Sequence, residues 1–157
     1  MPLLQVAVTA GSFSEDGRQR LVRGLTDAAC RAESVPDDPL ARARAVVIWD
    51  SLAPGSVYWG GNAADELIVG IFISYRVSDG VLDPVRRQEF SAAVEAEVAG
   101  ALPEDDRRIT FTSVIFDEVA EGRWGRDGAI RRLPEMAAAA GFEHLRAIAD
   151  AKDPSAE

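Results

Sequence analysis

The chain has 157 residues, 47% of them hydrophobic and 27% charged, which is the composition of one soluble globular domain with a sizeable core. Its formal net charge of −9 argues against a surface that neutralises phosphates, so we expect no nucleic-acid partner. No apolar run approaches the roughly 18 residues that span a bilayer, and no cationic segment precedes a hydrophobic one at the amino terminus. These features predict a cytoplasmic protein without a membrane partner.

The sequence also excludes several kinds of site. The chain has one cysteine, Cys30, and one histidine, His144, so it has no internal disulfide and no His/Cys metal set. It has no phosphate-binding loop and no dinucleotide glycine motif. We therefore expect neither a metal nor a cofactor.

The first half of the chain predicts a strand, a helix and a second strand. A strand is expected over residues 3–9, and the hydroxyl of Ser14 is suited to cap the helix that follows. Pro36 and Pro39 end this helix, and a second strand is expected over residues 45–49. The apolar residues of the helix recur at helical spacing and are Leu21, Leu25, Ala28, Ala29 and Ala32.

The second half predicts the same order of elements. A strand is expected over residues 66–75, and another over 108–116. Between them, Asp83 followed by Pro84 indicates a helix start, because proline is well suited to the first helical position. The inward face of this helix carries Phe90, Val94 and Val98.

Short elements complete each half. Glycine-flanked turns over residues 55–61 and 122–128 predict two small hairpins. An alanine-rich helix is expected from residue 134 to about 150, and residues 152–157 form a tail.

A repeat relates the two halves. Trp59 and Trp124, each followed by glycine, are 65 residues apart, and the same offset aligns the first strand with the third. It also places Leu25 onto Phe90 and Ala29 onto Val94, on the inward face of each expected helix.

The repeat predicts an α+β fold of two tandem β-α-β units, over about 2–61 and 66–128. They make up one domain over residues 1–133, and residues 134–157 form the carboxyl-terminal helix and tail. Because a strand–helix–strand crossover is right-handed, two copies give a four-stranded mixed sheet with both helices on one face.

The third strand is apolar on both of its alternating faces, from Leu67 to Ile73. This pattern is typical of a sheet that is covered on both sides, but two helices cover only one side. Since monomers rarely expose a large apolar patch, we expect a homo-oligomer that packs sheet face against sheet face.

Pro2 precedes the first strand directly. If Met1 is removed, Pro2 presents a secondary amine, which can act as general base, general acid or nucleophile near neutral pH. Many chains begin Met-Pro without any chemical reason, so the position alone does not establish catalysis.

Taken together, these features resemble the tautomerase superfamily (4-oxalocrotonate tautomerase-like). They are Pro2, the tandem units, Val57-Tyr58-Trp59-Gly60-Gly61 and Gly122-Arg123-Trp124-Gly125. The likeness is to the long fused members near cis-3-chloroacrylic acid dehalogenase and malonate semialdehyde decarboxylase. It implies a homotrimer that needs no cofactor and acts through an amino-terminal proline on enols and on unsaturated 2-oxo and 3-substituted acids.

The resemblance also assigns roles. Pro2 matches the catalytic proline, and Arg76 matches an arginine that binds the carboxylate of a small acid substrate. Arg123, Arg126 and Tyr75 are the residues we expect to stabilise negative charge on the substrate's carbonyl oxygen.

Three positions depart from the dehalogenase pattern. Ala29 stands where those enzymes have a histidine, Asp79 where they have a second arginine, and Arg123 where they have a water-activating glutamate. A tautomerase or isomerase is therefore favoured over water addition. A decarboxylase, with Asp37 or Asp38 matching its aspartate, a hydratase or dehalogenase-like enzyme, and a non-catalytic scaffold that binds a small acid remain the alternatives.

Overall fold

The structure is a computed structural model, and it describes residues 2–140. His144, the later part of the expected carboxyl-terminal helix, the tail and Met1 lie outside these residues. The elements in chain order are β1 (Leu3–Val8), α1 (Glu15–Ala32), α2 (Pro39–Arg42), β2 (Val46–Ser51), β3 (Tyr58–Trp59), β4 (Asn62–Ala63), β5 (Ile68–Ser78), α3 (Pro84–Ala101), β6 (Ile109–Val119), β7 (Trp124–Arg126), β8 (Ala129–Arg131) and α4 (Leu133–Ala140).

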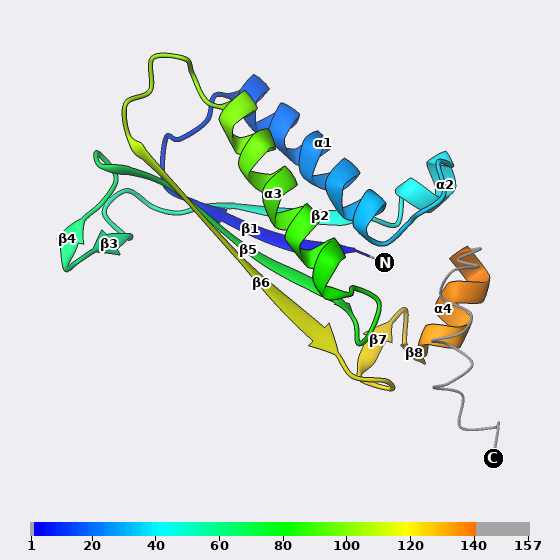
Figure 1. Ribbon diagram of the computed structural model, residues 1–157. Coiled ribbons are helices and arrows are strands. Elements are labelled where there is room, and N and C mark those ends of the chain that lie inside the picture. The colour runs from blue at the N-terminus through cyan, green and yellow to red at the C-terminus, as the bar shows by residue number, and fades with distance from the viewer. Residues whose placement is uncertain (1, 141–157) are drawn as a thin grey trace.

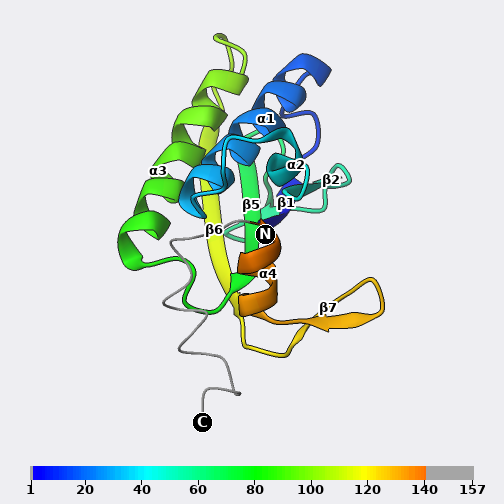
Figure 2. The same cartoon turned by 90° about the vertical axis from the view of Figure 1, so that its right-hand side faces the viewer.

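Four strands form one sheet in the order β2-β1-β5-β6. The pairs β1–β2 and β5–β6 are parallel, while the central pair β1–β5 is antiparallel. Helices α1 and α3 lie side by side on one face of this sheet (Figures 1 and 2). The expected α+β fold, with a mixed sheet and two helices on one face, is confirmed.

The two halves begin in the same way. The carbonyl oxygen of Pro2 accepts a hydrogen bond from the Val46 N–H at 3.0 Å, and that of Leu67 accepts one from the Ile109 N–H at 2.9 Å. Pro2 and Leu67 therefore occupy equivalent positions at the heads of β1 and β5. They are 65 residues apart, which is the offset of the sequence repeat.

The helices follow a different offset from the strands. Helix α3 begins at Pro84, 69 residues after Glu15 at the start of α1. The extra four residues are about one helical turn, so the inward face is kept. The expected alignment of Leu25 with Phe90 is therefore corrected to Leu21 with Phe90, and Leu25 pairs instead with Val94.

Both expected helix caps are present. The Ser14 hydroxyl accepts the Gly17 N–H at 3.1 Å, and the Asp83 carboxylate accepts the Arg86 N–H at 2.8 Å. The short helix α2 was not expected from the sequence. It begins because Asp38 caps it in the same way, with Pro39 at the first helical position.

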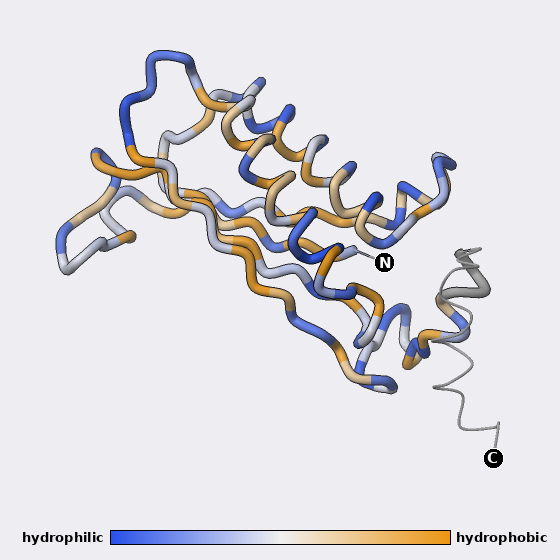
Figure 3. Tube along the Cα trace, in the orientation of Figure 1, coloured by the Kyte–Doolittle hydropathy of each residue, from blue (hydrophilic) through white to orange (hydrophobic). Residues whose placement is uncertain are grey.

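The core fills the space between the sheet and the two long helices. Tyr75 on β5 lies at its centre, with its ring 4.7 Å from that of Phe90 and 5.8 Å from that of Phe116. The predicted inward residues of both helices are buried there, and these are Leu21, Leu25, Ala28, Ala29, Ala32, Phe90, Val94 and Val98. Figure 3 shows these hydrophobic stretches along the strands, whereas the connection from α3 to β6 is hydrophilic.

The other face of the sheet, which we call the open face, is not covered by any helix (Figure 1). Ile48 is 46% exposed there and Ile115 is 61% exposed. The β3–β4 hairpin covers only one end, where the Trp59 ring lies 4.8 Å from that of Phe111. A single chain thus leaves apolar surface in water, as the sequence pattern predicted.

The remaining elements lie at the end of the sheet where β1 begins. The β7–β8 hairpin follows β6 at this end, and α4 follows the hairpin (Figures 1 and 2). Leu133 at the start of α4 is buried in the core cluster. None of the helices within residues 2–140 combines the length and hydrophobicity that a membrane span requires.

Candidate active site

Pro2 is buried at the head of β1. Its carbonyl hydrogen bond to Val46 holds the head of β1 against β2. Leu4, Val6 and Val8 are buried on the side of β1 that faces the helices. Because side chains alternate along a strand, Pro2 belongs to the same helix-facing side.

A hydroxyl and a carboxyl group meet in this layer. Tyr75 pairs with Leu4 across β1 and β5, and it is fully buried. Its Oη donates a hydrogen bond to Glu33 Oε1 at 3.1 Å and lies 3.4 Å from the carbonyl oxygen of Ala29. Tyr75 therefore contacts Glu33, in the core, and presents no surface to solvent in the single chain.

Burial raises the pKa of Glu33, while the positive charge at the amino terminus and the hydrogen bond from Tyr75 oppose this change. Burial also raises the pKa of Tyr75, and the charge of Glu33 raises it further. Both groups therefore favour their protonated forms in the folded chain.

Glu33 was not predicted as a site residue. It follows α1 directly as the residue that caps its carboxyl end. The signal was present, because Leu25, Ala29 and Glu33 follow one another at intervals of four residues on a helical face that is otherwise apolar. A carboxylate on such a face is rarely buried without a specific partner.

Arg76 lies on the open face. It pairs with Leu3 across β1 and β5, one residue from the position opposite Pro2. Its Nε is 3.7 Å from Asp117 Oδ2 on β6, and its side chain is 42% exposed. Arg76 is thus close to Pro2 along the sheet, but it projects from the opposite side of the strands.

Arg123 and Arg126 belong to the segment of the β7–β8 hairpin. Arg123 is exposed, and Arg126 Nε lies 3.3 Å from Asp127 Oδ2. The hairpin is at the same end of the molecule as Pro2 (Figure 1). These arginines therefore share an end of the fold with Pro2 but sit on a separate small sheet.

A small cavity lies between α1 and the segment that leads to α2. Its volume is about 220 Å³, and Cys30, Asp37 and Arg42 are among its lining residues. Arg42 forms an ion pair with Asp27, also on the lining. Of the two aspartates that the resemblance suggested, Asp37 lines this cavity and Asp38 caps α2.

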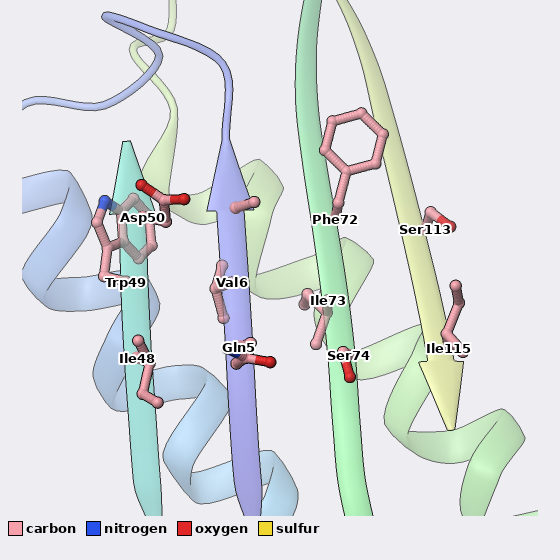
Figure 4. Close-up of a pocket in the computed structure, with 11 residues that line it drawn as sticks. Gln5, Val6, Ile48, Trp49, Asp50, Phe72, Ile73, Ser74, Ser113 and Ile115 are labelled. Carbon is pink, nitrogen blue, oxygen red and sulfur yellow. The ribbon is translucent and has the colours of Figure 1, made fainter. Parts of the chain in front are cut away.

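A larger hollow of about 630 Å³ lies on the open face (Figure 4). Its lining combines apolar and polar side chains from all four strands of the sheet, among them Ile48, Gln5, Ser74 and Ile115. Within the described residues, no group of three or more His, Cys, Asp or Glu side chains is arranged to hold a metal.

Two fused β-α-β units that form a β2-β1-β5-β6 sheet, with two helices on one face and Pro2 at the head of a central strand, make up the fold of the tautomerase superfamily. The chain has the 4-OT-like form of this fold. No protein-family model and no curated protein matches the sequence.

Several solved structures match the chain. A fused 4-OT that forms a symmetric trimer has a TM-score of 0.65 and 18% identity, covering 87% of this chain and 98% of its own. A member of the cis-3-chloroacrylic acid dehalogenase family has a TM-score of 0.63 and 17% identity, covering 94% and 96%. Macrophage migration inhibitory factor of Toxoplasma gondii has a TM-score of 0.58 and 14% identity, covering 82% and 99%.

Proposed function

We propose that the chain, after removal of Met1, is a cofactor-independent tautomerase or isomerase that acts on an enol or a 2-oxo acid. The observation that carries this proposal is the position of Pro2, buried at the head of a central strand and fixed through its carbonyl group to Val46. Met1 removal would turn the Pro2 nitrogen from an amide into a basic amine at this position. The cytoplasm is the compartment we propose.

In the proposed reaction, the Pro2 amine accepts the proton of the enol hydroxyl. It then gives a proton to carbon, so that a C–H bond forms as the carbonyl group is restored. No atom is gained or lost, and the amine returns to its starting form. Such a proton shift requires no metal and no cofactor.

The other site residues support this reaction in the proposal. Arg76 binds the substrate carboxylate, because a guanidinium group donates two parallel hydrogen bonds to a carboxylate. Arg123 and Arg126 stabilise negative charge on the carbonyl oxygen. Tyr75 acts through Glu33 rather than by direct contact, since its side chain is fully buried.

We further propose that the chain forms a homotrimer through the open face. Ile48, Ile109 and Ile115 are 46%, 70% and 61% exposed on this face, which favours its burial by further copies. Fused 4-OT structures that match the fold are trimers. Such an assembly would also bring residues from a second copy near the open-face arginine Arg76.

Two measurements test the proposed function. Intact-mass analysis decides whether Met1 is absent. If it is, the rates of the wild type and of Pro2→Ala are compared by spectrophotometry with phenylenolpyruvate and 2-hydroxymuconate. We expect a loss of about 100-fold or more in Pro2→Ala, the usual range for loss of a general acid or base.

Pro103→Ala serves as the control, because Pro103 is an exposed proline in the α3–β6 connection. Its rate should equal that of the wild type. Retention of Met1, or equal rates for Pro2→Ala and the wild type, would contradict the proposal. Absence of turnover with binding of small acids would support a non-catalytic scaffold instead.

A further inference from the structure

Glu33 is the only charged side chain within residues 2–140 that is fully buried. Burial of a carboxyl group is costly unless partners stabilise it. Tyr75 Oη provides one such partner at 3.1 Å. The proton transfer described above makes no direct use of Glu33, so the fold retains a costly group whose purpose is not explained by packing.

Glu33 lies in the same layer as Pro2. Tyr75, which holds the carboxyl group, is opposite Leu4, and Leu4 and Pro2 are on the same side of β1. Pro2 itself is buried at this end of the strand. The Pro2 nitrogen of a chain without Met1 is thus a basic group in the same buried layer, at the same end of the sheet, as a buried acid.

Electrostatic effects point to the same neighbourhood. The positive charge at the amino terminus lowers the pKa of Glu33 against the larger effect of burial. It acts in the same direction on the Cys30 thiol, whose pKa is raised chiefly by burial. The amino-terminal charge is therefore within electrostatic reach of both groups.

We propose that the Glu33 carboxyl group and the Pro2 amine hold one proton between them, with Tyr75 fixing the carboxyl group in place. Glu33 is then a positioning residue that sets the protonation state of Pro2. This inference rests on one part of the proposed function, the removal of Met1. It does not require that the chain catalyses any particular reaction.

A shared proton has a measurable consequence. When two coupled groups titrate together, the last proton leaves the pair at a higher pH than it would leave the amine alone. The Pro2 amine therefore stays protonated to higher pH while Glu33 is present. Its conjugate acid, the form that donates a proton to carbon, is stabilised.

Other charged groups near this layer do not change in the comparison that tests the inference. Arg86 on α3 donates to the Ala32 carbonyl oxygen and to Ser34 Oγ, beside Glu33. Arg42 is paired with Asp27, Arg76 is near Asp117 on the opposite face, and Cys30 lines the small cavity. All of them are retained when only Glu33 is replaced.

The test is a direct titration of the amine. Protein labelled with ¹⁵N-proline is followed by NMR against pH, in the wild type and in Glu33→Gln, after mass analysis has confirmed the absence of Met1. The Pro2 resonance should report an apparent pKa that is lower in Glu33→Gln by about one unit or more, the effect of removing a nearby opposite charge. Glu33→Met provides a second uncharged variant of similar shape.

Glu135→Gln is the matched control, because Glu135 is an exposed carboxylate near the same end of the fold and undergoes the same chemical change. It should leave the Pro2 titration within about 0.3 units of the wild type, since exposed charges are screened by solvent. An unchanged Pro2 pKa in folded Glu33→Gln or Glu33→Met would overturn the inference. A lowered pKa in a chain without tautomerase activity would sustain it and reject only the proposed reaction.

Discussion

Arg76 on β5 and Asp117 on β6 lie directly opposite each other, with Arg76 Nε 3.7 Å from Asp117 Oδ2. Ser74 Oγ donates a hydrogen bond to the same carboxylate oxygen at 2.5 Å. Both members of the ion pair are partly exposed, so the pair is accessible from the open face. Asp117 therefore competes with a substrate carboxylate for Arg76.

Removal of this competition should strengthen substrate binding. Asp117→Asn is expected to lower KM for a carboxylate substrate by up to about fivefold, because a partly exposed ion pair contributes about 0–1 kcal/mol. Steady-state kinetics measures the change. Asp50→Asn, on the hollow of the same face, is the control and should leave KM unaltered. A higher KM in Asp117→Asn would show that Asp117 helps to form the site.

Replacement of Arg76 should have the opposite effect. Arg76→Gln is expected to raise KM for the same substrate by about 10- to 100-fold, since hydrogen bonds to charged groups contribute about 1.5–3 kcal/mol. The comparison should include an ester of the substrate, whose KM is expected to change little. An equal change for acid and ester would mean that Arg76 does not bind the carboxylate.

A charge placed on the open face should prevent assembly. Ile115 is 61% exposed in the single chain, and Ile115→Asp is expected to give monomers in light scattering while circular dichroism retains the folded signal. Val85→Asp is the matched control, because Val85 is 65% exposed on α3, away from the open face. If both variants assemble like the wild type, the open face is not the interface.

Three helical glycines should respond differently to alanine. A Cβ at Gly17 of α1 would lie 2.7 Å from the backbone carbonyl oxygen of Ala101, whereas one at Gly24 would meet only the flexible side chain of Glu97. A Cβ at Gly100 of α3 would contact nothing within 4 Å. Urea unfolding should show Gly17→Ala destabilised by about 1–3 kcal/mol and Gly100→Ala stabilised by about 0.5–1 kcal/mol.

Gly24→Ala should fall between the other two, because Glu97 can move away from the new methyl group. The expected order of stability is Gly100→Ala, then Gly24→Ala, then Gly17→Ala. If Gly17→Ala were as stable as Gly100→Ala, the two helices would not be as close as the structure places them.

Stability should depend on pH through Glu33. Burial raises its pKa above the usual 4.5, so the folded chain keeps a proton that the unfolded chain loses. By linkage, the free energy of unfolding contributed by this group is greatest below pH 4.5 and falls as the pH rises through the folded pKa. Glu33→Gln should remove this fall when urea unfolding is compared at about pH 4.5 and about pH 8.

Glu15→Gln gives the control of opposite sign. Hydrogen bonds from Gln19 and Arg18 lower the pKa of the exposed Glu15 carboxylate. Its small contribution to stability is therefore present above the unfolded pKa and lost as the pH falls. A Glu33→Gln variant with the same pH dependence as the wild type would show that Glu33 is ionised equally in both states.

The sequence predicted the sheet and its two helices because their signals are local. Ser14 and Asp83 are caps that act within one turn, and the apolar residues of both helices follow the helical period. The offset between the helices was wrong by one turn, because the repeat was measured on strands and tryptophans. A helical face looks the same after four residues, so the pattern alone does not reveal such a shift.

The site was harder to predict because it depends on contacts between distant residues. Glu33 and Tyr75 are 42 positions apart, and their hydrogen bond exists only once α1 packs on β5. Tyr75 was expected to bind substrate, but alternation along β5 turns it into the core and turns Arg76 to the open face. The ion pair of Arg76 with Asp117 likewise follows from the register of β5 and β6.

The shared hydrogen-bond pattern of Pro2 and Leu67 has a consequence for the number of active centres. Leu67 occupies in the second unit the place that Pro2 occupies in the first, but its nitrogen is always part of a peptide bond and has no basicity. Fusion of two units into one polypeptide thus leaves one reactive nitrogen for every two structural repeats. The second unit is relieved of this chemistry, and β5 and β6 are left to supply Tyr75, Arg76 and Asp117 around the one that remains.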